Sequence, residues 1–328
     1  MIRYGIAGFG LHAVKRLMPG FAKARSSKVV ALSRRNLEQG RADAAHYGIE
    51  HAFATTEELC QCPEVDAVIV SSPNALHLAD VLMAVRHGKA VLCEKPMALN
   101  AMEAEQMAAA AKERGGMLGI AQCFRFEDTV RRIRERVQRK EIGEILSIRI
   151  DFTFDGTASP RKWLHDAALA GGGPIPDLGV HTIDAMRAIL GDEPTEVSAW
   201  THSDQPAGGV ETSAVLNLRF SKGATGSSYV SFRSPYQSPI EIYGTGGLIF
   251  ARDGLNTEHP VTVEVRKPGG VETEELSNAA TYTRQVDAFS EALEGGAPFS
   301  VPAAEGVRNQ KILDAFYRSA RSGRAEAV

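Results

Sequence analysis

Residues 2–13 read IRYGIAGFGLHA, and this stretch decides how the first part of the chain folds. Its first six residues are predicted to form a strand, and the residues after position 13 a helix. The turn between them carries a G-x-G-x-x-A pattern at Gly8, Gly10 and Ala13. Gly8 permits a tight turn, Gly10 lets a pyrophosphate approach the backbone, and Ala13 lets the helix pack closely on the sheet. Because a helix N-terminus also offers free N–H groups to phosphate, we expect a dinucleotide-binding turn. Its predicted contacts are Gly8, Phe9, Gly10, Leu11 and His12.

Strand-like and helix-like segments alternate through the rest of the first 122 residues. Strands are predicted over residues 28–33, 66–71, 90–93 and 117–122, and helices over residues 36–47, 75–87 and 100–114. Asn36, Asn74 and Asn100 are predicted N-caps, and Gly48 and Gly88 are predicted stops. Alternation of this kind indicates parallel strands joined by right-handed crossovers. The first 122 residues are therefore predicted to be a domain of α/β class with a doubly wound parallel sheet.

Residues 123–328 show a different pattern, which predicts a second domain. Helices are expected over residues 129–140, 177–190, 282–294 and 303–320, and one long strand over residues 145–154. Six further strands follow one another, over residues 197–200, 214–220, 226–232, 240–244, 248–251 and 261–265. Successive strands joined by turns favour an α+β domain with a large, mainly antiparallel open sheet. Trp200, at the end of one strand, is predicted to be a packing residue.

The amino-acid composition limits the kinds of partner and ligand that the protein is expected to bind. Of the 328 residues, 44% are hydrophobic and 23% charged, and the formal net charge is -3, which does not favour nucleic-acid binding. Apolar runs stay short of the roughly 18 residues that span a bilayer, and no signal-peptide core follows Met1, so no membrane partner is expected. Cys60, Cys62, Cys93 and Cys123 have neither a zinc-site spacing nor the density of a disulfide scaffold. We therefore predict no metal, and a cytoplasmic protein.

The end of the second predicted strand indicates which coenzyme is used. An NAD enzyme usually carries a carboxylate there to hold the ribose 2′-OH, but this chain has Ser33, Arg34 and Arg35. A hydroxyl and two guanidinium groups suit a 2′-phosphate, because arginine pairs with phosphate in a bidentate manner. The sequence therefore predicts NADP(H) in preference to NAD(H). The alternative reading is a solvated basic turn.

Several motifs occur in a fixed order along the chain. They are Ser72-Pro73-Asn74-x-x-His77, Glu94-Lys95-Pro96, Phe124-Arg125-Phe126, Gly171-Gly172-Gly173, Asp177-x-x-x-His181, the segment IEIYGTGGL at residues 240–248 and the closing segment at residues 314–320. Together they resemble the Gfo/Idh/MocA oxidoreductase family over essentially the whole chain. The resemblance implies a Rossmann domain followed by an α/β domain whose open sheet forms homodimers or homotetramers. It also implies NAD(P)-dependent hydride transfer to or from a sugar or polyol.

The resemblance assigns roles to single residues. Lys95 matches a lysine near the nicotinamide and substrate, and Glu94 a position that contacts the coenzyme. His181 matches a proposed acid/base histidine, Asp177 its carboxylate partner, and Trp163 a tryptophan near the coenzyme. Ser72, Asn74 and His77, from the first motif, are predicted coenzyme contacts as well, although a hydrogen bond to a nearby loop fits His77 equally well. Related chains usually carry arginine directly after the tryptophan, where this chain has Leu164; Arg161 lies two residues before Trp163.

Physical reasoning supports the catalytic assignments of Lys95, Asp177 and His181. Lys95 follows a buried strand at the edge of the sheet where ligands bind in such folds, although alone it would read as a solvated loop lysine. Asp177 and His181 are four residues apart, so a helix places them on one face, where the carboxylate can fix the imidazole tautomer. The alternative is a packed histidine. Lys95, Asp177, His181 and Arg125 are also the predicted substrate contacts, although Arg125 fits a structural ion pair equally well.

The predicted function is therefore an NADP(H)-dependent oxidoreductase acting on a small-molecule sugar, polyol or related carbonyl substrate. Two alternatives remain open. One is a glycosidase of the same family that uses a tightly held nicotinamide as a recycled oxidant. The other is a non-catalytic sensor that binds the dinucleotide; the presence of Lys95, Asp177 and His181 argues against it, since a sensor needs no proton-transfer groups.

Overall fold

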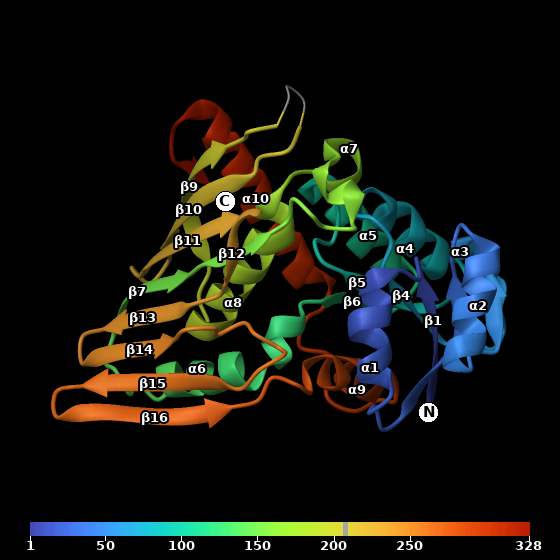
Figure 1. Ribbon diagram of the computed structural model, residues 1–328, viewed down its shortest axis with the longest axis horizontal. Helices are drawn as coiled ribbons and strands as arrows, with labels where there is room; N and C mark the ends of the chain where they lie inside the picture. The colour runs from blue at the N-terminus through green and yellow to red at the C-terminus, as the bar shows by residue number, and fades with distance from the viewer. Residues whose placement is uncertain (206–208) are drawn as a thin grey trace. The chain divides into compact units, whose positions relative to one another are not determined.

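The computed structural model describes residues 1–205 and 209–328, which divide into two compact units. Unit 1 comprises Met1–Gln122 and Tyr282–Gln310, and unit 2 comprises Cys123–Thr281 and Lys311–Val328. Figure 1 labels the helices and strands along the chain. None of the helices in these described ranges has the length and apolar character that crossing a membrane would need.

Unit 1 is built on a six-stranded parallel sheet in the order β3-β2-β1-β4-β5-β6. The strands are β1 (Ile2–Ala7), β2 (Ser27–Ser33), β3 (His51–Phe53), β4 (Ala67–Val70), β5 (Ala90–Glu94) and β6 (Leu118–Ala121). The predicted doubly wound parallel sheet is confirmed. The strand order reverses between β1 and β4, and ligands bind such sheets at the carboxyl ends of the strands flanking this reversal. The three-residue β3 was not predicted, because so short a strand shows no periodicity.

The helices of unit 1 cover this sheet. They are η1 (Ala13–Leu17), α1 (Met18–Phe21), α2 (Leu37–Tyr47), α3 (Thr56–Gln61), η2 (Asn74–Leu76), α4 (His77–Arg86) and α5 (Ala101–Glu113). Two predicted caps are confirmed, because the side chains of Asn36 and Asn100 accept hydrogen bonds from the backbone N–H three residues on. The predicted cap at Asn74 is wrong. A 3₁₀ turn over Asn74–Leu76 precedes α4, and Leu76 takes the N-cap position.

Residues 282–310 belong to unit 1, whereas the sequence analysis assigned everything after residue 122 to the second domain. They contain most of α9 (Thr281–Leu293) and the start of α10 (Ala303–Ser322). The backbone N–H of Ile120 in edge strand β6 donates to Val301 O at 2.9 Å. The rings of Phe289 and Phe299 lie 5.1 Å apart, and both contact the position where Gly119 lacks a Cβ. The segment thus covers an edge strand that would otherwise leave its backbone unpaired.

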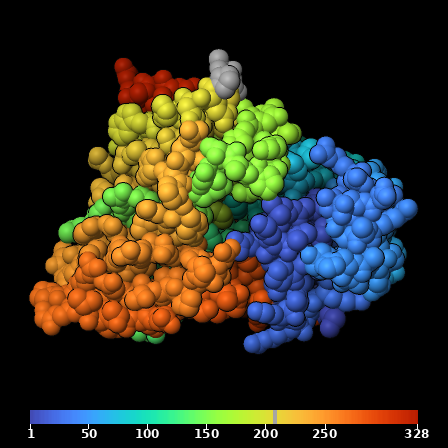
Figure 2. All heavy atoms as spheres, viewed as in Figure 1, coloured from blue at the N-terminus to red at the C-terminus, as the bar shows by residue number. Residues whose placement is uncertain are grey.

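Unit 2 contains an eleven-stranded sheet whose main path is β16-β15-β14-β13-β7-β11-β10-β9-β17, with β8 pairing β11 and β12. The strands are β7 (Ile145–Ile150), β8 (Phe152–Asp155), β9 (Pro194–His202), β10 (Ser213–Phe220), β11 (Thr225–Ser231), β12 (Arg233–Gln237), β13 (Ile240–Gly244), β14 (Gly247–Ala251), β15 (Val261–Lys267), β16 (Gly270–Leu276) and β17 (Glu326–Ala327). Most pairings are antiparallel, as predicted, and β7 and β8 pair β11 in parallel. In Figure 2 the strands β13 to β16 form a continuous orange surface of this unit.

The predicted single strand over residues 145–154 is in fact two strands, β7 and β8. They are separated at Asp151, whose Oδ1 accepts a hydrogen bond from Tyr229 N at 2.8 Å. The carboxylate also accepts three hydrogen bonds from the guanidinium of Arg149. A side chain that takes a backbone donor from the neighbouring strand replaces one bond of the ladder, and this explains the break.

The helical elements of unit 2 are η3 (Cys123–Phe126), α6 (Asp128–Gln138), η4 (Lys162–His165), α7 (Ala167–Ala170), η5 (Ile175–Gly179) and α8 (Val180–Leu190). Helix α8 is buried around most of its circumference, and it packs against α6 and the sheet. Contacts with the sheet include Met186, which lies against Gly226 of β11. The η5 and α8 segments follow each other directly, and they carry Asp177 and His181.

One face of the unit 2 sheet carries several large exposed apolar side chains. Trp200 on β9 is 63% exposed, so its predicted packing role is wrong within this chain. Val215 on β10 and Tyr243 on β13 are also exposed, and the strand pairing places them on the same face as Trp200. Side chains alternate between the two faces of a strand, and the sequence alone does not say which face the helices cover.

Candidate functional site

The turn after β1 adopts the conformation that its glycines predict. Gly8 has a φ of +77°, and a Cβ there would lie 2.7 Å from the backbone N and Cα of Ser72. Phe9 N donates to Ser33 O at the end of β2, at 2.9 Å. The turn is thereby held against the ends of both neighbouring strands. Its positive φ and its close approach to the Ser72 backbone are enough to require glycine at position 8, whether or not a ligand binds.

Gly10 has a different environment. A Cβ at this position would have only Gly8 O as a neighbour within 4 Å, at 3.7 Å. Space for a side chain is therefore present, and nothing in the described chain accounts for the absence of one. Ala13 is fully buried and begins η1, and Leu11 is exposed. An open cradle at a helix N-terminus fits a dinucleotide pyrophosphate.

His12 links the glycine turn to the Glu94-Lys95-Pro96 motif. Its Nε2 lies 2.9 Å from Glu94 Oε1, and the other carboxylate oxygen of Glu94 accepts from Lys95 N at 3.3 Å. Burial alone would raise the pKa of Glu94, but the charge and hydrogen bond of His12 and the charge of Lys95 lower it below its ordinary value. Glu94 is therefore an ionised carboxylate beside the half-buried Lys95.

His77 links the other two loops at this edge of the sheet. The fully buried imidazole places Nδ1 3.0 Å from Pro96 O and Nε2 2.9 Å from Ser72 O. Burial lowers the pKa of His77, so the neutral ring donates to one of these carbonyls at a time. Of the two readings for His77, the structure supports a hydrogen bond to a neighbouring loop. Asn74 is buried, and Ser72 Oγ donates to Asp80.

The residues predicted to select the coenzyme lie at the end of β2 and just after it. Ser33 is buried, and the half-buried Arg34 forms an ion pair with Asp43 of α2. Arg35 is exposed, and no ion pair to it is found among residues 1–205 and 209–328. Asp43 therefore competes for Arg34 with any phosphate, whereas Arg35 faces no such competition.

In unit 2, Asp177 and His181 are both buried. Asp177 lies in the π-helical turn η5 and His181 is the second residue of α8, so the expected single α-helix begins with a wider turn. The His181 ring packs against Phe124, at 4.4 Å between centroids, and Phe152, at 6.0 Å. Two aromatic rings thus fix the orientation of the imidazole.

Arg125 forms the ion pair that was one of its two predicted roles. Its Nε and Nη2 donate to the two carboxylate oxygens of Asp184 at 2.7 and 2.6 Å. The pair is largely buried, and Arg187 Nη1 lies 3.8 Å from the same carboxylate. A substrate contact by Arg125 stays a prediction. Asp184 is not among the predicted site residues, because a structural role fits it equally well, and the ion pair with Arg125 is such a role.

The loop that carries Trp163 approaches the predicted site through Arg161. Trp163 is half-buried in η4, and the following Leu164 is buried, so no cation replaces the arginine of related chains at that position. Arg161 Nη2 lies instead 3.8 Å from Asp177 Oδ2. A guanidinium therefore does reach the predicted acid–base residues, but it comes from Arg161.

Side-chain and backbone atoms of the protein fill the space beside the glycines that precede η5. A Cβ on Gly172 would lie 1.8 Å from Tyr317 Oη, and one on Gly173 would lie 1.9 Å from Glu211 O. Glu211 Oε1 accepts hydrogen bonds from Ile175 N at 3.0 Å and from Tyr317 Oη at 2.9 Å. Sequence reasoning missed Glu211 altogether and noted Tyr317 only as part of a motif.

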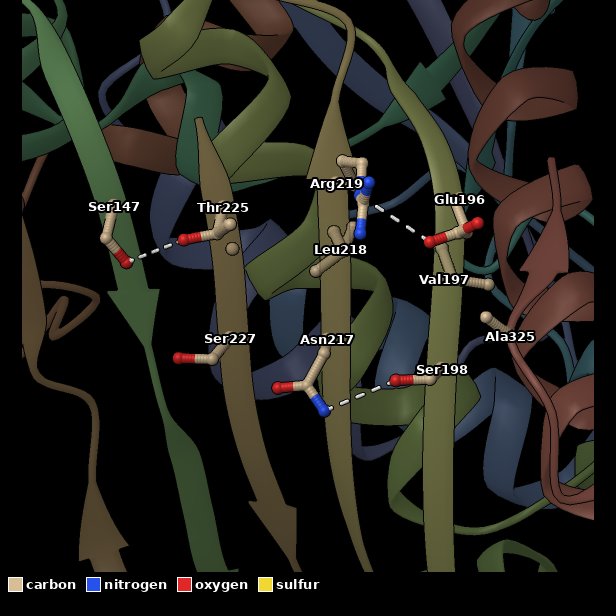
Figure 3. Close-up of a pocket in the computed structure, with 11 residues that line it drawn as sticks. Ser147, Glu196, Val197, Ser198, Asn217, Leu218, Arg219, Thr225, Ser227 and Ala325 are labelled. Atoms are coloured by element: carbon tan, nitrogen blue, oxygen red, sulfur yellow. Dashed lines mark hydrogen bonds and ion pairs between the residues drawn. The ribbon is translucent and has the colours of Figure 1, made fainter. Parts of the chain in front are cut away.

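A hollow of about 330 Å³ lies on the sheet of unit 2, away from all the predicted site residues (Figure 3). It is lined by Ser147, Glu196, Val197, Ser198, Asn217, Leu218, Arg219, Thr225, Gly226, Ser227 and Ala325. Figure 3 shows three pairs of polar side chains that join neighbouring strands: Asn217 donates to Ser198, Arg219 lies close to Glu196, and Thr225 donates to Ser147. Its lining residues include no unpaired acid or base, so the hollow is a poor candidate for a catalytic site.

One group of side chains among the described residues has the composition of a cation site. Glu50, His51 and Glu64 place their ligand atoms within 4.8 Å of one another. The group is half-exposed and pairs internally, with His51 Nε2 3.2 Å from Glu64 Oε2, and Glu50 accepts from Lys28. Exposed acidic groups of this kind are common without a metal, and the prediction of no metal stays a prediction.

Comparison with protein families identifies both parts of the chain. The model described as an oxidoreductase family with an NAD-binding Rossmann fold matches residues 2–122. The model described as the GFO/IDH/MocA C-terminal domain matches residues 130–250. The first match ends where the sequence analysis placed its boundary, and together the two cover well over half of the chain.

Relatives match over nearly the full length. A 1,5-anhydro-D-fructose reductase from Ensifer adhaerens is 32% identical, and the alignment covers 100% of this chain and 99% of the relative. A D-xylose 1-dehydrogenase (NADP(+)) from Haloferax volcanii is 32% identical over 98% of each chain. Among solved structures, an aldose-aldose oxidoreductase from Caulobacter crescentus, complexed with glycerol, superposes with a TM-score of 0.93 at 29% identity, covering 100% of this chain and 99% of the other.

Proposed function

The chain belongs to the Gfo/Idh/MocA family of oxidoreductases, and we propose that it transfers a hydride between NADP(H) and a sugar, polyol or related carbonyl compound. The observation that carries the proposal is the linked set of loops at the carboxyl edge of the parallel sheet. The turn at Gly10 has room that no part of the described chain fills, and His12 and Glu94 join it to Lys95. The names of the relatives, a sugar reductase and an NADP-dependent sugar dehydrogenase, support the substrate class and the coenzyme.

Unit 1 would hold the coenzyme. The predicted contacts of the glycine turn would bind its pyrophosphate, and Ser33 with Arg35 and Arg34 its 2′-phosphate. The remaining predicted contacts in unit 1 are Ser72, Asn74, His77, Glu94 and Lys95, and Trp163 of unit 2 is a further predicted contact. Among them His77 acts through the backbone of Ser72 and Pro96, because both of its ring nitrogens lie against these carbonyls. When bound, the nicotinamide supplies the hydride donor or acceptor.

The proton that accompanies hydride transfer would be handled by Lys95 and His181. Lys95 follows Glu94, whose carboxylate accepts from the Lys95 backbone N–H, and its ammonium group would polarise the substrate oxygen or donate a proton to it. His181 is held by two aromatic rings and would exchange the proton, with Asp177 fixing its tautomer. Arg161, whose Nη2 lies 3.8 Å from Asp177 Oδ2, would help to hold this carboxylate in place.

The first experiment is an NADPH oxidation assay against a panel of sugars, osones, inosones and anhydro sugars, after identification of any coenzyme that copurifies. With a substrate in hand, Lys95→Ala and His181→Ala are each expected to lower kcat by about 100-fold or more, since each removes a general acid or base. Lys112→Ala, an exposed lysine on α5, is the matched control. Unchanged kcat in both site variants would contradict the mechanism. Glycoside cleavage without net NADPH consumption would favour the glycosidase alternative, and binding without turnover would favour the sensor.

We also propose that the chain forms a homodimer or homotetramer through the exposed face of the unit 2 sheet. Trp200 and Val215, which pair across β9 and β10, make this face apolar, and apolar area of this kind favours association. Sedimentation of the wild type and of Trp200→Glu tests this proposal. The wild type should sediment as a dimer or tetramer and the variant as a smaller species, and a wild type that sediments as a monomer would contradict the proposal. The four free, buried cysteines support a reducing compartment, for which we propose the cytoplasm.

A further inference from the structure

The glycine run at residues 171–173 and the helix that follows it are held by two side chains that come from distant parts of unit 2. Glu211 lies just before β10, and Tyr317 lies in the second half of α10. The backbone carbonyl of Glu211 lies where a Cβ of Gly173 would be, and the hydroxyl of Tyr317 lies where a Cβ of Gly172 would be. The glycines are therefore required by these two neighbours, and room for a ligand need not be invoked.

The carboxyl group of Glu211 acts as a cap for the helix that carries Asp177. The first N–H groups of a helix have no partner within the helix and must be satisfied from outside. Ile175 N, at the start of η5, donates to Glu211 Oε1 at 3.0 Å, and the N–H of Gly173 also stabilises the ionised form of this carboxyl. A side chain 36 residues further along the chain thus serves as the cap that usually comes from the preceding residue.

Tyr317 completes the arrangement, because its hydroxyl donates to the same oxygen, Glu211 Oε1, at 2.9 Å. Burial raises the pKa of Tyr317, and the charge of Glu211 raises it further, so the hydroxyl keeps its proton and stays a donor. The hydroxyl thereby fixes the position of the carboxyl that caps the helix. We refer to Glu211 and Tyr317 together as the helix clamp.

Asp177 lies two residues after the clamped Ile175, and His181 lies four residues beyond Asp177. The aromatic rings of Phe124 and Phe152 fix the ring plane of His181, but they offer no hydrogen bond that would set the helix along its axis. The clamp supplies that constraint at the first turn, where the backbone is otherwise least restrained. We propose that Glu211 and Tyr317 are positioning residues for the proton transfer assigned to Asp177 and His181, an inference that rests on the proposed function.

The test uses substitutions that remove one hydrogen bond each. Tyr317→Phe keeps the ring and removes the hydroxyl donor, and Glu211→Ala removes the acceptor. Glu211→Gln retains an acceptor oxygen and should restore most of what Glu211→Ala loses. Tyr243→Phe is the matched control, because Tyr243 also donates to a glutamate, Glu241, at 2.9 Å, but at an exposed site on β13.

Two readouts separate the inference from the proposed function. Amide hydrogen exchange over residues 173–181 should accelerate in Tyr317→Phe and Glu211→Ala, with exchange in β10 and β11 unchanged, and Tyr243→Phe should match the wild type. In the assay, kcat per folded enzyme should fall about tenfold in Tyr317→Phe and about 100-fold in Glu211→Ala, because small displacements of a proton-transfer group are costly. The dissociation constant for NADPH should stay unchanged in all variants.

Unchanged exchange in both clamp variants would overturn the inference whether or not the wild type is active. Faster exchange with an unchanged kcat would also overturn it, since the clamp would then only stabilise the fold. A wild type that turns over no compound of the panel, with exchange responding as expected, would instead count against the proposed function, and the positioning role would fall with it.

Discussion

Two glycine-rich segments precede helices in this chain, and they use glycine for different reasons. In the turn at residues 8–13, Gly8 is packed against the backbone of Ser72, but Gly10 has open space around its missing Cβ. In the run at residues 171–173, the space beside Gly172 and Gly173 is filled by Tyr317 and Glu211. A glycine pattern before a helix therefore does not by itself indicate a ligand site. Whether a glycine makes room for a ligand or for the protein's own atoms depends on what surrounds its missing Cβ.

The same contrast applies to the two glutamates that accompany these segments. Burial alone would raise the pKa of Glu94, but the neighbouring His12 and Lys95 lower it. Burial raises the pKa of Glu211, although several hydrogen bonds partly offset it. The first carboxylate is stabilised in its charged form beside the predicted coenzyme turn, whereas the second is a buried cap for the helix that carries Asp177.

The largest expected effect is the loss of stability when a Cβ is added to a glycine that is already packed against other atoms. Gly173→Ala places a Cβ 1.9 Å from Glu211 O, and Gly8→Ala combines a φ of +77° with a Cβ 2.7 Å from the Ser72 backbone. Each should lower the free energy of unfolding by about 3 kcal/mol, because backbone cannot move aside as a flexible side chain can. Urea unfolding measures this, with Gly116→Ala as the control, since its nearest neighbour would be 3.6 Å away. Wild-type stability in Gly173→Ala would break the comparison.

Gly10→Ala should affect binding and leave the fold intact. The added Cβ meets only Gly8 O, at 3.7 Å, so the free energy of unfolding should stay within about 0.5 kcal/mol of the wild type. The dissociation constant for NADPH should rise at least about tenfold, because the methyl group occupies the path of the pyrophosphate to the backbone. Fluorescence titration with NADPH measures the change. An Ala variant that binds NADPH normally would show that Gly10 does not face the coenzyme.

The local parts of this arrangement could be predicted from the sequence. The alternation of elements predicted the parallel sheet, and Asn36 and Asn100 predicted helix starts, because caps and periodicity are properties of neighbouring residues. The glycine turn was predicted from its place between β1 and η1. In the same way the antiparallel character of the second sheet followed from strands joined by short turns.

The parts that depend on distant residues could not be predicted. The contact between His12 and Glu94 joins residues 82 positions apart, and that between Glu211 and Tyr317 joins residues 106 positions apart. The return of residues 282–310 to unit 1 depends on where edge strand β6 finds a backbone partner. The outward orientation of Trp200 depends on which face of the sheet α8 covers. None of these choices leaves a local pattern, because each is decided by tertiary packing.

A smaller effect sharpens the assignment of the first segment to a phosphate-bearing coenzyme. Asp43 forms an ion pair with Arg34, so Asp43→Asn should free the guanidinium for a 2′-phosphate. The dissociation constant for NADPH should fall about threefold and that for NADH should stay unchanged, since the ion pair is only partly buried. Glu38→Gln, an exposed acid in the first turn of α2, is the control for a change in net charge. Equal effects on NADPH and NADH would contradict the assignment of Arg34 to the phosphate.

The smallest expected effect is on the pH dependence of stability. Glu94 and Glu211 should change the free energy of unfolding in opposite directions as the pH rises. The pKa of Glu94 is below its ordinary value of 4.5, so its contribution to stability is present above that value and lost as the pH falls through the folded pKa. The pKa of Glu211 is raised, so its contribution is complete below 4.5 and is lost as the pH rises through the folded pKa. Glu94→Gln should therefore flatten the acid side of the stability profile, and Glu211→Gln the side above it. Urea unfolding between about pH 3 and pH 8 measures both slopes. If both variants flatten the same side of the stability profile, the two carboxyl groups have the same kind of environment. The proposed difference between Glu94, beside the predicted coenzyme turn, and Glu211, within the helix clamp, would then be wrong.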